Sequence, residues 1–328
     1  MIVITGGAGF IGSNLAAALE ARDEHDVVVC DRLGRDDKWR NLGKREISAF
    51  VPPEALLEFL EENARSISIV FHLGAISSTT EPDADLIVAT NFTMSLRLWE
   101  WCAATETRFI YASSAATYGD GSAGFDDDGS SVALARLRPL NAYGWSKHLF
   151  DRRVARLVEH HGARPSQWAG LKFFNVYGPN EYHKGSMKSV AAHIYPHAAK
   201  GEPARLFRSH RPDIADGGQK RDFVAVRDCV DMMLWLYDHP AANGLFNSGS
   251  GNARSFADLA TAVYRALGRD PQIEYVDTPI DIRDKYQYFT EARMDRLRAA
   301  GYTAAPTSLE DGVRDYVQSY LAAADPYR

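Results

Sequence analysis

A cluster of glycines directly after the first strand-like segment constrains the fold of this chain more than any other feature. Residues 2–5 are apolar and mostly β-branched, and residues 14–21 favour a helix. The glycines between them are Gly6, Gly7, Gly9 and Gly12. Such glycines let the backbone turn sharply and approach a pyrophosphate, which the N–H groups at the start of the helix can bind. This strand, turn and helix together predict a dinucleotide site.

Strand-like and helix-like segments alternate through the first half of the chain. The apolar segments lie at residues 2–5, 27–30, 67–72 and 109–112, and the helical ones at residues 14–21, 56–64, 94–104 and 149–160. Strands separated by helices imply right-handed crossovers and a parallel sheet. The predicted fold class is α/β, a Rossmann-type doubly wound parallel sheet with a smaller, loop-rich α/β substrate-binding domain.

The pattern changes after residue 173. Residues 177–188 and 207–222 are rich in Gly, Pro, Lys, Arg and His without periodicity, which is typical of binding loops. A strand near Phe223 should return to the cofactor side. We therefore expect an NADP-binding Rossmann domain made of residues 1–172 and 222–247, interleaved with a substrate-binding domain made of residues 173–221 and 248–328.

Charged residues follow the second strand-like segment, where the adenosine ribose of a dinucleotide should lie. Asp31 ends this segment, and an acidic residue there would bind the ribose 2′-hydroxyl of NAD. Arg32 and Lys38 come next, and such cations could hold the 2′-phosphate of NADP. We favour NADP as the cofactor, with NAD as the alternative.

A serine, a tyrosine and a lysine form a candidate hydride-transfer set. Ser114 closes the fourth strand-like segment, and Tyr143 and Lys147 are four residues apart, on one face of a helix. An ammonium group nearby is expected to lower the pKa of the tyrosine. Tyr143 could then take a hydroxyl proton while a hydride leaves for nicotinamide, and Ser114 could orient the same oxygen.

Several segments resemble the extended short-chain dehydrogenase/reductase superfamily, whose members mostly act on nucleotide-diphosphate sugars. They are TGGAGFIG at the glycine turn, YASSAATYG at 111–119, YGWSK at 143–147, FNVYGP at 174–179 and KRDFV at 220–224. Ala115 and Ala116 stand where 4,6-dehydratases of this superfamily carry an Asp-Glu pair. Dehydration is therefore disfavoured, and epimerisation or simple redox chemistry remains.

Other segments are similar to the ADP-glyceromanno-heptose 6-epimerases. These are HKGSM at 183–187, SSTTE at 77–81, LNAYGWSK at 140–147 and YQYFT at 286–290. The resemblance implies inversion of C6 of the heptose in ADP-D-glycero-D-manno-heptose, a precursor of the lipopolysaccharide core, by transient oxidation with bound NADP. It also implies a homo-oligomer, with a pentamer as one candidate.

The resemblance implies roles for further residues. Lys184 matches the second acid/base group of the family, and Lys147 should also contact the nicotinamide ribose. The implied cofactor contacts, besides the glycines, Asp31, Arg32, Lys38, Tyr143, Lys147 and Lys184, are Phe10, Ile11, Leu73, Gly74, Ala75, Ser77, Asn91 and Val176. The implied substrate contacts are Ser114, Asn175, Ser186, His193, Phe207, Arg221 and Tyr286. No metal ligands are expected.

Composition narrows the classes of protein that remain. The net charge is −6, which argues against general binding to nucleic acid or to an anionic membrane surface. No apolar run approaches the ~18 residues that span a bilayer. Three cysteines at scattered positions favour a reducing cytoplasm. The competing hypotheses are a UDP-hexose 4-epimerase or another NDP-sugar oxidoreductase, and a non-catalytic dinucleotide sensor.

Overall fold

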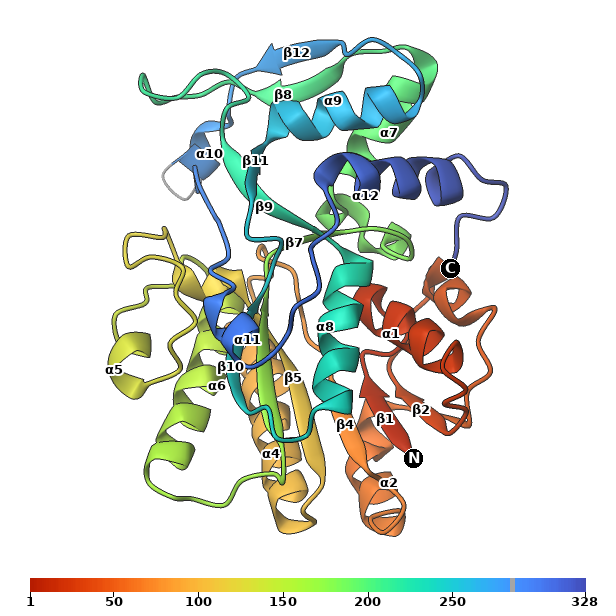
Figure 1. Ribbon diagram of the computed structural model, residues 1–328, viewed down its shortest axis with the longest axis vertical. Coiled ribbons are helices and arrows are strands. Elements are labelled where there is room, and N and C mark those ends of the chain that lie inside the picture. Colours follow the sequence, from red (N-terminus) through yellow and green to blue (C-terminus); the bar gives the residue numbers. More distant parts are fainter. Residues whose placement is uncertain (284–286) are drawn as a thin grey trace.

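A computed structural model describes residues 1–283 and 287–328, and its larger part is built on a parallel sheet (Figure 1). The seven strands of this sheet run in the order β10-β6-β5-β4-β1-β2-β3, and every neighbouring pair is parallel. They are β1 (Ile2–Thr5), β2 (Val27–Cys30), β3 (Ala49–Val51), β4 (Ile69–His72), β5 (Arg108–Ser114), β6 (Trp168–Phe173) and β10 (Gly244–Ser248). The predicted fold class is confirmed.

Most helices of this part lie between its strands along the chain, and the last helix follows the last of these strands. They are α1 (Phe10–Glu20), α2 (Leu56–Glu62), α3 (Ala84–Ile87), α4 (Met94–Ala104), α5 (Ser131–Leu134), α6 (Ala142–Glu159), α8 (Val226–Asp238) and α11 (Asp295–Ala299), with short turns η1 (Asp37–Leu42), η2 (Pro53–Ala55), η3 (Val88–Thr93) and η4 (Ala115–Tyr118). The chain leaves β1 towards β2 and returns on the other side at β4, so strand order reverses between β1 and β4. Ligands of doubly wound sheets bind at such a reversal, outside the carboxyl ends of the strands.

The strands next to this reversal are buried on both faces. Every residue of β1, β2 and β4 is buried, which explains their unbroken apolar, β-branched sequences. Aromatic side chains fill the far side of the core, where Trp99 contacts Phe109 and Trp168 edge-on. These aromatic contacts lie at the amino ends of β5 and β6, at the end of the sheet opposite the carboxyl ends of the strands. No helix in the described ranges has the length and apolar character needed to cross a membrane.

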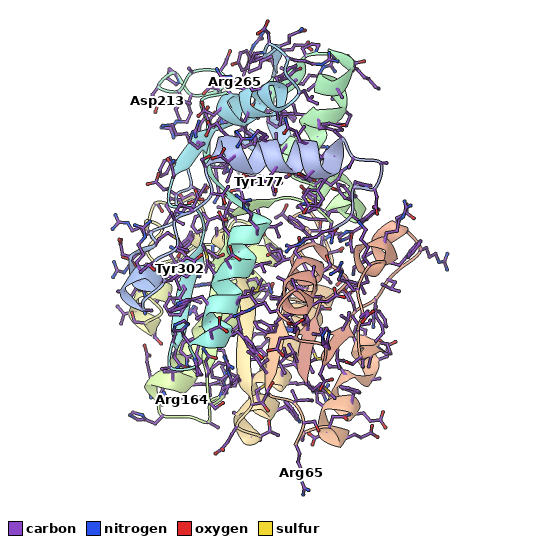
Figure 2. All side chains as sticks on the ribbon, turned by 45° about the vertical axis from the view of Figure 1, so that its right-hand side comes forward. Arg65, Arg164, Tyr177, Asp213, Arg265 and Tyr302 are labelled. Carbon is purple, nitrogen blue, oxygen red and sulfur yellow. The ribbon has the colours of Figure 1, made fainter. Side chains whose placement is uncertain are left out.

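The smaller part contains two short sheets. One joins β7 (Asn175–Tyr177), β9 (Lys220–Ala225) and β11 (Ala253–Ser255), and the other pairs β8 (Ala204–Phe207) with β12 (Ile273–Val276). Its helices and turns are η5 (Tyr182–Met187), α7 (Val190–Lys200), α9 (Phe256–Ala266), α10 (Ile280–Arg283), α12 (Leu309–Asp315) and η6 (Tyr316–Leu321). These elements bury a second apolar cluster, which includes Ile194, Leu206, Val263 and Val313. Figure 2 shows Tyr177 where the two parts meet, with Asp213 and Arg265 at the far end of the smaller part.

Local structure differs from the sequence expectation at several boundaries. The helix expected at 149–160 begins at Ala142, because Asn141 caps it by accepting a hydrogen bond from the N–H of Gly144. The loops expected at 177–188 and 207–222 contain a strand end, the η5 turn and the start of β9. The strand expected near Phe223 exists, but it pairs with β7 and β11 rather than with the large sheet.

Candidate active site

A cavity of about 440 Å³ opens where strand order reverses between β1 and β4. Residues from the glycine turn, from the carboxyl ends of β4 and β5, from α6 and from the 175–187 segment line it together. Of the residues selected from sequence, the cavity is lined by Gly6, Gly9, Phe10, Ile11, Gly12, Asp31, Lys38, Leu73, Gly74, Ala75, Ser77, Ser114, Tyr143, Lys147, Asn175, Val176 and Lys184. Residues from distant parts of the chain thus surround one space large enough for a ligand.

The glycine turn is packed so closely that larger residues do not fit. Gly6 has φ of 68°, and a methyl group added there would lie 2.6 Å from the backbone N of Gly74. A methyl group on Gly12 would lie 2.2 Å from the carbonyl oxygen of Gly6. The first turn of α1 therefore lies against the glycine turn at the cavity wall, and the N–H groups at the start of a helix are favourable for binding a pyrophosphate.

Substitution of Gly12 by alanine should disrupt this turn. The new methyl group has to displace backbone rather than a flexible side chain, so we expect a loss of roughly 1–3 kcal/mol of stability and at least a tenfold loss of dinucleotide affinity. Thermal unfolding and cofactor titration measure both effects. Gly43→Ala is the matched control, because its methyl group would meet the Arg40 carbonyl at 3.3 Å, outside the cavity. Equal behaviour of the two variants would contradict the assigned role of the turn.

The acidic residue after β2 is already neutralised by a lysine. Asp31 accepts a hydrogen bond from the N–H of Ala8 at 3.0 Å and pairs with Nζ of Lys38 at 2.6 Å. Lys38 also donates to the carbonyl oxygen of Arg32 at 2.9 Å. The Arg32 side chain is exposed and pairs with Glu54 at 3.2 Å. Lys38 is therefore the cation that reaches the cavity here.

Ser114, Tyr143 and Lys147 converge from the end of β5 and the first turns of α6. Lys147 is 4% exposed, and its Nζ donates to the carbonyl oxygen of Ala112 at 2.8 Å. Burial lowers the pKa of Lys147 to about 8. The expectation of a lowered tyrosine pKa is wrong for this structure: burial raises the pKa of Tyr143, and its hydrogen bond with Ser114 offsets only part of that rise.

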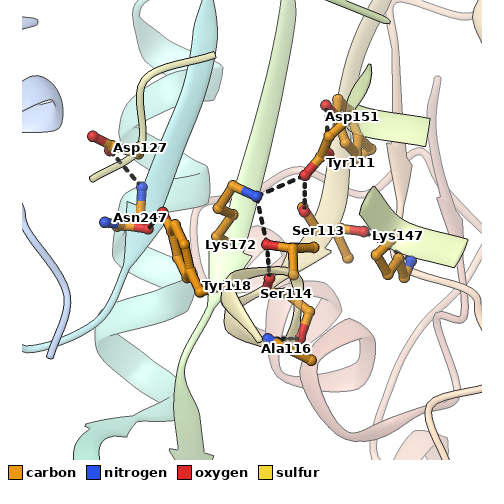
Figure 3. A network of polar contacts seen from close by, with 12 residues as sticks. Tyr111, Ser113, Ser114, Ala116, Tyr118, Asp127, Lys147, Asp151, Lys172 and Asn247 are labelled. Atoms are coloured by element: carbon orange, nitrogen blue, oxygen red, sulfur yellow. Dashed lines mark hydrogen bonds and ion pairs between the residues drawn. The ribbon is translucent and has the colours of Figure 1, made fainter. Parts of the chain in front are cut away.

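A fully buried ion pair lies behind this set (Figure 3). Nζ of Lys172 on β6 lies 2.8 Å from a carboxylate oxygen of Asp151 on α6, and both side chains are 0% exposed. Asp151 also accepts from Ser113 at 2.7 Å, and Lys172 donates to Thr117 at 2.6 Å. Because Ser113 and Thr117 flank Ser114, this network holds the end of β5 in place under the cavity.

Lys184 approaches the cavity from the η5 turn in the smaller part. Its Nζ lies 5.2 Å from the ring centre of Phe10, which lies between Gly9 and Gly12 of the glycine turn. Burial lowers the pKa of Lys184, and Glu181 raises it by a smaller amount. Within the described ranges, the Lys184 ammonium makes no hydrogen bond or ion pair. A partly desolvated amine of this kind suits proton transfer near neutral pH.

Some residues selected from sequence lie outside the cavity wall. Those within the described residues are Gly7, Arg32, Asn91, Ser186, His193, Phe207 and Arg221, and Tyr286 lies outside the described residues. Asn91 is buried and binds the backbone of Ile76 and the hydroxyl of Ser146, so it fixes the loop after β4 to α6. His193 contacts the carbonyl oxygen of Ser186 at 3.2 Å.

Arg221 lies deep at the start of β9. Its guanidinium donates to the carbonyl oxygens of Lys220 and Gln287 and lies 5.5 Å from the ring centre of Phe256. The neighbouring Asp222 accepts instead from backbone N–H groups of Ser250, Gly251 and Ala292. These contacts join the start of β9 to Gln287 and to the first residue of α9.

The cavity also contains residues that sequence reasoning missed. They are Thr79, Ala112, Ser113, Ala115, Ala116, Phe173, Phe174, His183, Met187, Gln287 and Thr290. Thr79, His183, Met187, Gln287 and Thr290 fall within segments already noted for their similarity to the heptose epimerases, so position in those segments was the available signal. Loop residues that line a cavity have no periodicity that would distinguish them from loop residues in contact with solvent.

The model of the NAD dependent epimerase/dehydratase family matches residues 2–249. The chain belongs to this family. The predicted resemblance is confirmed, and it extends to relatives over the full length. The ADP-L-glycero-D-manno-heptose-6-epimerase of Nitratidesulfovibrio vulgaris strain DP4 is 50% identical over 329 residues and covers 100% of both chains. That of Fusobacterium nucleatum subsp. nucleatum is 45% identical, also over 100% of both chains.

Solved structures of two sugar-nucleotide epimerases share the fold. The ADP-L-glycero-D-manno-heptose-6-epimerase of Helicobacter pylori has a TM-score of 0.79 at 28% identity, covering 98% of this chain and 96% of that one. The UDP-glucose 4-epimerase of Thermus thermophilus, solved in complex with NAD, has a TM-score of 0.77 at 24% identity, covering 98% of this chain and 99% of that one. The second likeness concerns the fold alone.

Proposed function

We propose that this member of the epimerase family inverts C6 of the heptose in ADP-D-glycero-D-manno-heptose, giving the L-glycero form for the lipopolysaccharide core. The heptose-epimerase relatives support this activity, because the similarity runs over the whole chain at 50% identity. The single structural observation that carries it is that Tyr143 and Lys184 enter one cavity from different elements. Inversion at one carbon requires acid/base groups on both of its faces.

The residues present fit a nicotinamide dinucleotide. The glycine turn leaves no room for a methyl group at Gly6 or Gly12, as expected where backbone must approach a pyrophosphate. A bound nicotinamide would supply the hydride acceptor and donor that oxidation and re-reduction at C6 require. We propose that Lys147 binds the nicotinamide ribose and that Ser114 orients the C6 oxygen. Tyr143 and Lys184 each handle the hydroxyl proton on one face of the transient ketone.

We infer NADP rather than NAD from the cations at the end of β2. Lys38 lines the cavity and touches Asp31, so a 2′-phosphate on the adenosine ribose would meet an ammonium group there. Arg32 follows on the exposed side and could turn from Glu54 towards the same phosphate.

Lys38→Ala should weaken NADP by roughly 10–100-fold, the value of a hydrogen bond to a charged group, and leave NAD affinity nearly unchanged. Removing the ammonium also exposes the phosphate to the Asp31 carboxylate. Cofactor titration by fluorescence measures both dissociation constants. Lys44→Ala is the matched control, since Lys44 pairs with Asp325 outside the cavity. Equal losses for NADP and NAD in Lys38→Ala would overturn the assignment.

The deciding experiment for the activity is incubation with ADP-D-glycero-D-manno-heptose without added cofactor, with the C6 configuration read by NMR. Turnover supports the proposal. Turnover of UDP-glucose instead would favour a hexose 4-epimerase. Tight dinucleotide binding without turnover of any NDP-sugar would favour a sensor. Mass spectrometry of the denatured supernatant identifies the cofactor that remains with the protein.

We also propose that the two parts of the chain bind different ligands. Residues 1–172 and 222–247 would bind the dinucleotide, and residues 173–221 and 248–328 the sugar nucleotide. We also propose a homo-oligomer, which native mass spectrometry tests, and a cytoplasmic location. The buried, unpaired thiols of Cys30, Cys102 and Cys229 suit a reducing compartment.

A further inference from the structure

The turn that carries Lys184 is held at its beginning by a buried carboxylate. Glu181 is 0% exposed and accepts hydrogen bonds from the hydroxyls of Ser189 at 2.6 Å and Tyr316 at 2.9 Å. These partners belong to the smaller part of the molecule. They secure the start of the turn, but they do not fix how its tip lies against the cofactor side.

A second anchor comes from His183, directly before Lys184. Nδ1 of His183 lies 3.2 Å from Nδ2 of Asn41, on the η1 turn that also carries Lys38. The same Nδ2 donates to the carbonyl oxygen of Ala8, in the glycine turn, at 2.9 Å. An amide nitrogen can only donate, so Nδ1 of His183 has to be the acceptor. The ring is therefore the tautomer with its proton on Nε2.

Burial, and to a smaller extent the nearby cations, keep this ring neutral. Burial, together with the cations Lys38 and Lys184, lowers the pKa of His183 to about 4, while Asp31 and Asp36 have smaller opposing effects. At pH values well above 4 the imidazole is neutral, and its Nδ1 can accept the hydrogen bond from Asn41. A protonated ring could not, since both of its nitrogens would be donors.

His183 and Lys184 therefore both connect to the glycine turn, each through a different contact. His183 reaches Ala8 through Asn41, and Lys184 lies against the ring of Phe10. Ala8 and Phe10 both belong to the turn that would hold the pyrophosphate. The position of the Lys184 ammonium is thus set relative to the cofactor, across the boundary between the two parts.

We propose that His183 is a positioning residue, which holds Lys184 in place against the glycine turn through Asn41. This inference rests on the proposed function of Lys184 as the second acid/base group. Such a group has to lie within a fraction of an ångström of its working position, and a misplacement of about 1 Å can cost on the order of 100-fold in rate.

His183→Phe keeps a ring and removes both nitrogens. We expect kcat for epimerisation to fall roughly 10–100-fold, with NADP affinity within a few-fold of the parent. His183→Asn retains an acceptor near the Nδ1 position and should stay within about fivefold of the parent. His197→Phe is the control, because His197 is exposed on α7 and pairs with Glu202. Equal losses in His183→Phe and His183→Asn would overturn the acceptor role.

Asn41, the residue that His183 contacts, provides a second test of the proposal. Asn41→Leu should produce the same loss of kcat as His183→Phe, and the double variant should lose no more than either single variant. Additive losses would mean that the two residues act separately, which contradicts the proposal. Thermal unfolding of each variant separates misfolding from misplacement.

A third measurement, chemical modification of Lys184, does not depend on epimerase activity. The pH dependence of Lys184 modification by an amine-reactive reagent, followed by mass spectrometry, reports its pKa, with exposed Lys200 as the internal reference. In folded His183→Phe and Asn41→Leu the pKa of Lys184 should rise towards the ordinary value of a lysine, because the turn loosens into solvent and the burial that lowers this pKa is relieved. An unchanged profile in both variants overturns the proposal. A shifted profile in a protein that does not epimerise ADP-heptose would refute the proposed function while leaving the contact in place.

Discussion

Tyr143→Phe should lower kcat for epimerisation of ADP-D-glycero-D-manno-heptose by about 10²–10⁴-fold, the range over which a positioned acid/base group contributes. The substitution removes one hydroxyl from a ring that packs beside Ser114 at the cavity wall. The ring itself stays, so neither the fold nor NADP binding should change appreciably. Progress of the reaction by NMR and cofactor titration separate the two effects.

A matched control for this variant is Tyr195→Phe. Tyr195 lies on α7, away from the cavity, and is only partly buried. Its kcat should remain within about twofold of the parent, since surface changes away from such sites have small effects. A parent-like kcat in Tyr143→Phe would remove Tyr143 from proton transfer.

Lys184→Met should cause a comparable loss, about 10²–10⁴-fold in kcat. Methionine keeps most of the apolar side chain against Phe10 and deletes only the ammonium group, so the η5 turn should stay in place. The loss should be confined to one of the two faces of C6. An aldehyde analogue at C6 would still be processed by this variant through Tyr143, on a single face.

Isotope labelling of the hydride position tells the two faces apart. Processing of the analogue on both faces by Lys184→Met would exclude Lys184 from acid/base catalysis and leave it as a phosphate or cofactor contact. Lys188→Met is the control within the same segment, because Lys188 follows η5 and does not line the cavity.

Local chemistry allowed the glycine turn and the tyrosine–lysine pair to be predicted from sequence. Both depend on short spacings within one strand–turn–helix or one helix, where periodicity alone sets which residues are neighbours. The prediction for the tyrosine pKa failed for the opposite reason. It considered the charge of Lys147 but not the burial of Tyr143, and desolvation is the larger effect.

Two contacts, one made by the η5 turn and one between α6 and β6, could not be predicted from the sequence. His183 and Asn41 are 142 positions apart, and Lys172 and Asp151 are 21 apart on different elements. Neither pair has a spacing that a helix or strand would bring together. Tertiary packing joins them, because η5 contacts η1 across the boundary between the two parts and α6 packs against the large sheet.

The sequence by itself therefore determined the doubly wound sheet, the dinucleotide turn, the Tyr143 and Lys147 pair and the family, because each is encoded in residues close along the chain. Only the tertiary structure decided which cation beside Asp31 lines the cavity, how burial shifts the pKa values of Tyr143 and Lys147, and which residues contact the turn that carries Lys184. These properties depend on desolvation and on contacts between distant segments, and both arise only when the two parts of the chain pack around one cavity.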